Sequence, residues 1–168
     1  MPQRPITNHD AALTLLNIAA ILELTDGNPY RVRAYRRAVL FLLQLRVPAT
    51  EFLTPSGELM LPGLGERLRR KLGELFARGE MSFYRDLYAS LPPEMVKLMR
   101  VPGIGPRTAL RLMVELELES PEDVIQAAEA GAIRKLYRFG EKSEANLARA
   151  ARALIESSSK EPDLFEAA

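Results

Sequence analysis

Two short segments, forty residues apart in the chain, have nearly the same sequence. Leu61-Pro62-Gly63-Leu64-Gly65 and Val101-Pro102-Gly103-Ile104-Gly105 each place an apolar residue and a proline before two glycines that flank one aliphatic residue. A helical pattern of apolar residues begins directly after each segment. Glycine permits backbone angles that other residues avoid and lets a second backbone come close. The first turn of the following helix offers unpaired N–H groups and a partial positive charge, which favour a bound anion such as phosphate.

This arrangement resembles the helix-hairpin-helix motif, whose usual ligand is the sugar-phosphate backbone of DNA. A third, weaker copy is Arg138-Phe139-Gly140-Glu141-Lys142-Ser143, in which Arg138 replaces the first glycine. Arginine adopts a left-handed backbone angle less readily than glycine. The third copy therefore leaves two interpretations open, a structural turn or a ligand contact.

Apolar residues recur at helical spacing through most of the chain, and strand signals are almost absent. The sequence predicts an all-α protein with tandem helix-hairpin-helix motifs in two small helical units. The first unit, residues 1–80, holds the first hairpin, and the second, residues 81–157, holds the second and the degenerate third. Residues 158–168 are expected to form a disordered tail. Helices are expected near residues 10–25, 28–47, 66–78, 82–91, 94–100, 106–116, 120–131 and 141–157, with a short helix ending at 137.

Composition excludes several classes of site. The 168 residues include no cysteine and one histidine, so disulfides, thiolate chemistry and imidazole clusters are ruled out. His9 is expected to be a solvated residue near a helix cap. Residues 1–5 lack the apolar run of a signal peptide, and no long apolar segment is free of charges. We expect a cytoplasmic protein with no membrane contact.

The net charge of +1 hides an uneven distribution. Residues 1–111 carry a balance of +6 and residues 112–168 a balance of −5, so both complete hairpins lie in the positive part. An anionic partner is expected there, although basic residues also simply solvate helix faces. Arg31, Arg33, Arg36 and Arg37 crowd the first turns of a helix that begins at Asn28-Pro29. Because the helix dipole disfavours cations at that end, a bound phosphate would compensate.

These residues together resemble the N-terminal part of family X DNA polymerases, over roughly residues 8–155. Residues 28–38 are similar to the second helix of the family's small lyase domain, and residues 61–71 to that domain's hairpin and following helix. Residues 101–107 resemble the hairpin of the adjoining fingers subdomain. Phe139-Gly140-Glu141-Lys142 is similar to a segment near the end of this region in bacterial members.

The family's palm binds two catalytic metals through paired aspartates, and such carboxylates must lie close together. The five aspartates of this chain are widely separated, and one histidine cannot supply the phosphoesterase domain that bacterial members carry. The chain is therefore expected to be neither a polymerase nor a metal-dependent nuclease.

The resemblance also implies roles for individual residues. Lys71 falls on the lysine that attacks the C1' aldehyde of a 5'-deoxyribose phosphate, and Tyr35 on a tyrosine that supports it. Arg31 and Arg67 fall where the 5'-phosphate is held, and Tyr30 where a ring stacks on a base. The complete set of expected DNA contacts is Tyr30, Arg31, Arg36, Gly63, Gly65, Arg67, Arg70, Gly103, Gly105, Arg107 and Thr108. No cofactor is required, but K⁺ or Na⁺ is expected at the hairpins through the backbone carbonyls of Leu59, Leu61, Leu64, Met99, Val101 and Ile104.

Lys71 also has a plain structural interpretation. On a helix that starts at Glu66 it lies on the polar stripe, where Glu74 three residues later would pair with it and keep it protonated. Against that, Arg67 and Arg70 would lower its pKa.

Three functions therefore stay open. The leading one is a DNA-binding module that recognises the backbone and ends of nicked, gapped or branched DNA in repair. The second adds lyase activity, and the third is a helical protein-protein adaptor that keeps the hairpins only for packing. A polymerase or another repair protein is an expected partner. Residues 161–165 also resemble the short peptides that dock on the bacterial sliding clamp.

Overall fold

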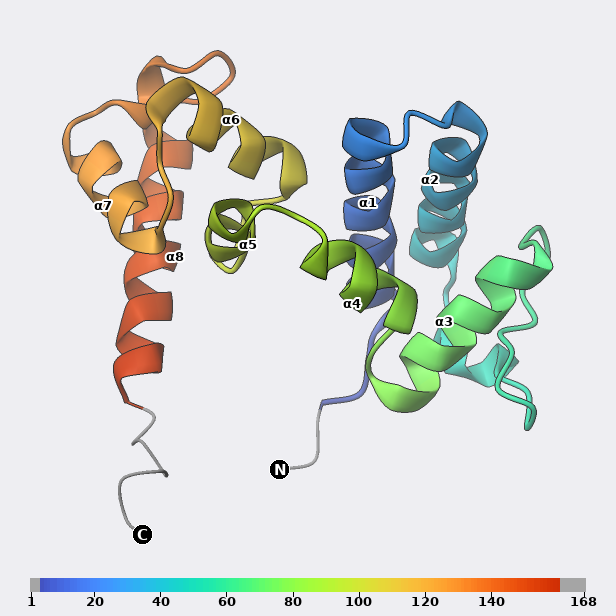
Figure 1. Cartoon of the computed structure of the whole chain (residues 1–168). Coiled ribbons are helices and arrows are strands. Elements are labelled where there is room, and N and C mark those ends of the chain that lie inside the picture. The colour runs from blue at the N-terminus through green and yellow to red at the C-terminus, as the bar shows by residue number, and fades with distance from the viewer. Residues whose placement is uncertain (1–3, 161–168) are drawn as a thin grey trace, which may run out of the picture. The chain divides into compact units, whose positions relative to one another are not determined.

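The computed structural model describes residues 4–160, and most of these residues are helical (Figure 1). Within them no strand occurs, and an isolated antiparallel bridge joins Leu53 and Leu59. The all-α prediction is confirmed. The α-helices are α1 (Asn8–Thr25), α2 (Pro29–Gln44), α3 (Glu66–Arg78), α4 (Ser82–Ala89), α5 (Pro93–Met99), α6 (Pro106–Leu116), α7 (Pro121–Glu129) and α8 (Glu141–Ser159), with 3-10 turns η1 (Ala49–Phe52) and η2 (Ile133–Lys135).

The chain divides into two compact units, Met1–Ser90 and Leu91–Ala168. The boundary lies ten residues later than the sequence suggested, because α4 packs against α1 and α3 of the first unit. Met81, which precedes α4, is buried in the core of that unit. The Asn17 side chain of α1 also donates a hydrogen bond to the Tyr84 hydroxyl of α4 at 3.2 Å.

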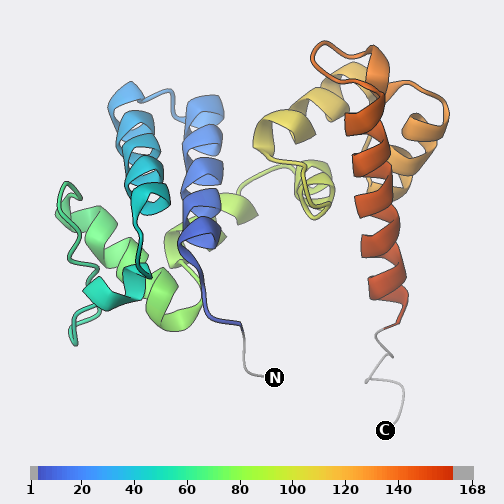
Figure 2. The same cartoon turned by 180° about the vertical axis from the view of Figure 1, so that it is seen from behind.

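The first unit is built on the helix pair α1 and α2, which lie side by side in Figures 1 and 2. Thr7 and Asp10 form a reciprocal capping box at the start of α1. At the start of α2, the Asn28 side chain accepts hydrogen bonds from two backbone amides. Both helices bury a stripe at helical spacing, which creates the core. On α2 the buried residues are Val32, Tyr35, Ala38, Val39 and Leu42.

Helix α3 contacts the preceding loop through its backbone. The Leu59 amide donates to the Arg69 carbonyl at 3.0 Å, so the loop runs directly along the helix. Gly73 makes this approach feasible, since a Cβ atom there would lie 1.8 Å from the Gly57 carbonyl oxygen. A residue with a side chain at position 73 would push the loop away from α3.

The second unit joins α7 to α8 through η2 and a buried carboxylate. Glu144 of α8 is 2% exposed and accepts from the Arg134 amide at 2.8 Å and from its guanidinium at 2.7 Å. Burial alone raises the pKa of Glu144, but the hydrogen bonds and charge of Arg134 outweigh it and hold the pKa below its ordinary value.

Helix α8 continues to Ser159, beyond residue 157, where the sequence suggested that the tail begins. Residues 161–165, which resemble a clamp-binding peptide, lie outside the described residues. Between residues 4 and 160, no helix is both long enough and apolar enough to cross a bilayer.

We predict that Gly73→Ala destabilises the protein by about 3 kcal/mol, because the new methyl group collides with backbone rather than with a flexible side chain. Gly65→Ala is the matched control, since a Cβ there meets no atom within 4 Å. Thermal unfolding followed by circular dichroism measures both. Equal melting temperatures for the two variants would show that the loop does not need Gly73.

We also predict that Glu144→Gln destabilises the second unit by about 2 kcal/mol at neutral pH, the typical loss for hydrogen bonds to a charged group. Because folding lowers the pKa of Glu144, its stabilising effect is present above its ordinary pKa and is lost as pH falls through the folded value. At acidic pH, the free energies of unfolding of wild type and variant, measured by chemical denaturation, should therefore differ less. A difference that stays constant down to strongly acidic pH would contradict this assignment.

Candidate functional site

The three hairpins share one backbone conformation. Gly63 has a φ of +83° and Gly103 of +93°, and Arg138 occupies the same left-handed region at +68°. In each hairpin, the amide of the residue after this left-handed position donates a hydrogen bond to a carbonyl three residues before it. The donor and acceptor pairs are Leu64 and Leu61 at 3.4 Å, Ile104 and Val101 at 3.0 Å, and Phe139 and Leu136 at 3.0 Å. The third copy therefore forms the hairpin even though its left-handed residue carries a side chain, at a strain on the order of 1 kcal/mol.

The helices that follow the hairpins begin without side-chain caps. Their N-cap residues are Gly65, Gly105 and Gly140, all with extended backbone and no capping hydrogen bond. Helices α1, α2 and α7 differ, because a side chain satisfies amides at each of their starts. A Cβ on Gly65 or Gly140 would meet nothing within 4 Å, so packing does not require glycine there. The first amides after the first and third hairpins thus have room for an anion from outside.

The three helix starts differ in charge. Helix α6 has no acidic residue in its first turn, whereas α3 has Glu66 and α8 has Glu141 and Glu144. Carboxylates near these amides compete with an incoming anion. The second hairpin is therefore the best anion site by charge, and the third is the poorest.

The structure brings together the two residues expected to act in catalysis. Lys71 of α3 is half-buried, and its Nζ donates to the Tyr35 hydroxyl of α2 at 2.8 Å. The same Nζ lies 3.4 Å from the ring centroid of Phe83, which comes from α4. Sequence reasoning missed Phe83, because its contact depends on α4 folding back onto α3 and no local motif marks that approach.

The surroundings of Lys71 change its acidity. Burial lowers the pKa of the Lys71 amine, and the charges of Arg31 and Arg67 lower it further. Burial also raises the pKa of Tyr35 to about 12, so this hydroxyl keeps its proton at neutral pH. Tyr35 can accept a hydrogen bond from the ammonium or donate one to the neutral amine, but it does not act as a base.

Two expected neighbours of Lys71 have other partners. Glu74 accepts hydrogen bonds from the Ser82 amide at 3.1 Å and from the Ser82 hydroxyl, so it caps α4 and does not pair with Lys71. Arg70 pairs with Glu58 and Glu66. The cations that lower the Lys71 pKa are Arg31 and Arg67, not Arg70.

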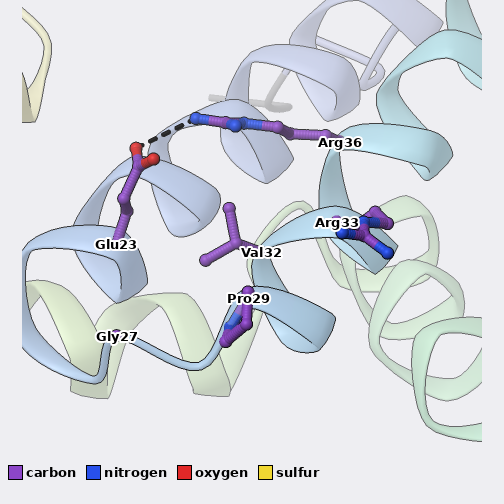
Figure 3. Close-up of a pocket in the computed structure, with 6 residues that line it drawn as sticks. All are labelled: Glu23, Gly27, Pro29, Val32, Arg33 and Arg36. Atoms are coloured by element: carbon purple, nitrogen blue, oxygen red, sulfur yellow. Dashed lines mark hydrogen bonds and ion pairs between the residues drawn. The ribbon is translucent and has the colours of Figure 1, made fainter.

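The expected DNA-contacting residues of α2 lie on more than one side of that helix. Tyr30 is 78% exposed, and Arg31 pairs with Asp26 at 2.9 Å. Arg36 reaches Glu23 of α1 at 2.9 Å across a pocket of about 310 Å³ (Figure 3). None of the residues around Lys71 lines this pocket, whose walls are Glu23, Gly27, Pro29, Val32, Arg33 and Arg36.

Some of the residues whose carbonyls are expected to bind a cation also have buried side chains, which hold the hairpins in place. The side chains of Leu61 and Leu64 are buried in the first unit, and those of Val101 and Ile104 in the second. The Leu61 and Val101 carbonyls each accept one amide within their hairpin. Each oxygen has a second lone pair.

Comparison with known proteins agrees with this geometry. Residues 6–81 match the model of a helix-hairpin-helix domain, and residues 95–153 match that of a SAM-like helix-hairpin-helix tandem. Two helix-hairpin-helix models thus match the chain in tandem, one in each compact unit. The second match spans the second and third hairpins together.

The chain is 29% identical over 157 residues to a Bacillus subtilis protein named DNA polymerase/3'-5' exonuclease PolX. The match covers 93% of this chain and 26% of the relative, so the chain spans about a quarter of that protein's length. The resemblance to the N-terminal helix-hairpin-helix region of a family X polymerase is thus confirmed.

Proposed function

We propose that this protein binds DNA in repair and recognises the backbone and ends of nicked, gapped or branched DNA without reading its sequence. The observation that carries the proposal is the pair of complete hairpins, each followed by a helix whose first amides have no side-chain cap. Backbone amides of this kind contact phosphates and carry no base specificity. The positive balance of residues 1–111 favours the same ligand.

We further propose 5'-deoxyribose phosphate lyase activity at Lys71. The neutral amine would attack the C1' aldehyde, and loss of water would give a protonated imine. Loss of a C2' proton then breaks the C3'–O bond and releases DNA with a 5'-phosphate, and hydrolysis of the imine restores the lysine. A lowered Lys71 pKa raises the neutral fraction that this chemistry needs. Arg31 and Arg67 would hold the 5'-phosphate near the amine.

The hairpin carbonyls are proposed to bind K⁺ or Na⁺ that bridges to a DNA phosphate. The free lone pairs on Leu61 and Val101 support this, since alkali cations prefer oxygen ligands. Replacing K⁺ by tetramethylammonium at constant ionic strength should weaken DNA binding. Unchanged affinity would remove the cation from the account.

A second candidate function, a protein-protein adaptor, is favoured by exposed leucines on α1 and α2. Leu13, Leu16, Leu40 and Leu43 are 48 to 59% exposed, and apolar side chains on a surface can contact a partner protein. A polymerase or another repair protein is the proposed partner. An adaptor without DNA binding would show no salt-dependent affinity for gapped DNA.

We predict that replacing Gly65 and Gly105 together by leucine lowers affinity for gapped DNA at least about tenfold, or about 1.4 kcal/mol. The bulky side chains would cover the open amides, while the single Gly65→Leu change should keep the melting temperature. Fluorescence anisotropy measures affinity, which should also fall steeply with salt. A double variant with full affinity would contradict backbone recognition.

We predict that borohydride traps a covalent adduct with gapped DNA bearing a 5'-deoxyribose phosphate, and that EDTA does not prevent it because the chemistry uses an amine. Lys71→Ala should abolish trapping and Tyr35→Phe should slow it, whereas Lys97→Ala, an exposed lysine in the second unit, should behave as wild type. Because the Lys71 pKa is lowered, trapping should rise with pH and level off below the pH expected for a free lysine. Equal trapping by Lys71→Ala would show that Lys71 is an ordinary surface lysine.

A further inference from the structure

The ring of Phe83 lies closer to the Lys71 ammonium group than the ring of Tyr35 does. The 3.4 Å between Nζ and the Phe83 centroid is well inside the range in which a ring face attracts a cation. By comparison, the Tyr35 centroid lies 5.5 Å from Nζ, so Tyr35 acts mainly through its hydroxyl. Phe83 and the Tyr35 hydroxyl therefore fix the amine at two separate points.

The Phe83 ring is itself held in place. It lies nearly parallel to the Tyr35 ring, at 8° and a centroid distance of 6.2 Å. The guanidinium of Arg31 lies 5.9 Å from the Phe83 centroid, so a second cation shares the ring. Glu74 fixes the start of α4 through Ser82, directly before Phe83 in the chain. The ring thus links the α2 and α3 parts of the site through α4.

We propose that Phe83 is a positioning residue of the Lys71 site, which holds the amine beside Tyr35 and orients it for attack on the aldehyde. The orienting role rests on the lyase activity proposed above, whereas the contact with the amine does not. The helix-hairpin-helix domain match ends at residue 81, so Phe83 adds to the site a residue from outside that domain.

The ring opposes the other influences on the amine. Burial and the cations Arg31 and Arg67 disfavour the ammonium, whereas the negative face of the ring favours it. Tyr35 stays neutral. The Glu74 carboxylate is charged but is held by Ser82, and the charges that shift the Lys71 pKa are those of Arg31 and Arg67. Removing the ring while keeping an apolar side chain should therefore lower the Lys71 pKa further. Removing the whole side chain should admit water and raise it.

Nuclear magnetic resonance of the lysine side chains in the full-length chain tests the contact directly. The chain has five lysines, so Lys71→Arg assigns the resonance. In wild type the Lys71 ε-protons should be shifted upfield by the ring, and Phe83→Leu should abolish this shift and lower the amine pKa. Phe83→Ala should raise that pKa. Phe76→Leu is the control, because Phe76 is a partly buried ring of the same core.

The lyase assay adds a second measurement. Phe83→Leu should slow borohydride trapping about tenfold and displace its pH profile, with DNA affinity unchanged, because misplacement of the amine affects the reaction more than binding. If wild type traps no adduct, the lyase proposal fails, and the resonance data alone decide whether Phe83 holds the amine. The proposal would be overturned if the Lys71 ε-proton chemical shifts in wild type match those of an exposed lysine. It would also be overturned if Phe83→Leu leaves the Lys71 pKa unchanged.

Discussion

The start of an α-helix leaves backbone amides without partners, and the way each start is satisfied organises this protein. Helices α1, α2 and α7 use Thr7, Asn28 and Ser120 as caps, so their amides are occupied. The helices after the three hairpins begin at glycines, which have no side chain to offer. Leaving such amides open is unfavourable unless water or an anion reaches them. The start of α5 also lacks a side-chain cap, but only the hairpin helices combine such a start with a preceding tight turn at a left-handed residue. This combination suits a phosphate backbone.

The two positions that carry glycine in the complete hairpins have different tasks. The first sits in the left-handed region, and Arg138 shows that the fold tolerates another residue there. The second has an ordinary extended backbone, and at Gly65 and Gly140 the space for a side chain is empty. Packing therefore does not require glycine at these two positions. In contrast, Gly73 serves packing alone, since it lets α3 touch the loop that carries the first hairpin.

Local sequence signals predicted most of the fold. Asn28-Pro29 and Ser120-Pro121 marked helix starts, and the repeated glycine segments marked the hairpins, because caps and turns depend on a few adjacent residues. The pairing of Lys71 with Tyr35 followed from family resemblance, not from the residues themselves. The domain boundary, the role of Gly73 and the contact with Phe83 could not be predicted. Each depends on segments that are distant in sequence or on how α4 folds back, and single-sequence patterns do not encode that.

The central claim is that the hairpin amides bind the DNA backbone. Backbone amide resonances of the ¹⁵N-labelled protein, recorded during titration with gapped DNA, test it most directly. The account predicts that the largest shifts occur at residues 65–67 and at Gly105 and Arg107, while the capped starts of α1 and α7 stay unchanged. Shifts confined to the exposed leucines of α1 and α2, or spread evenly over the basic surface, would contradict it.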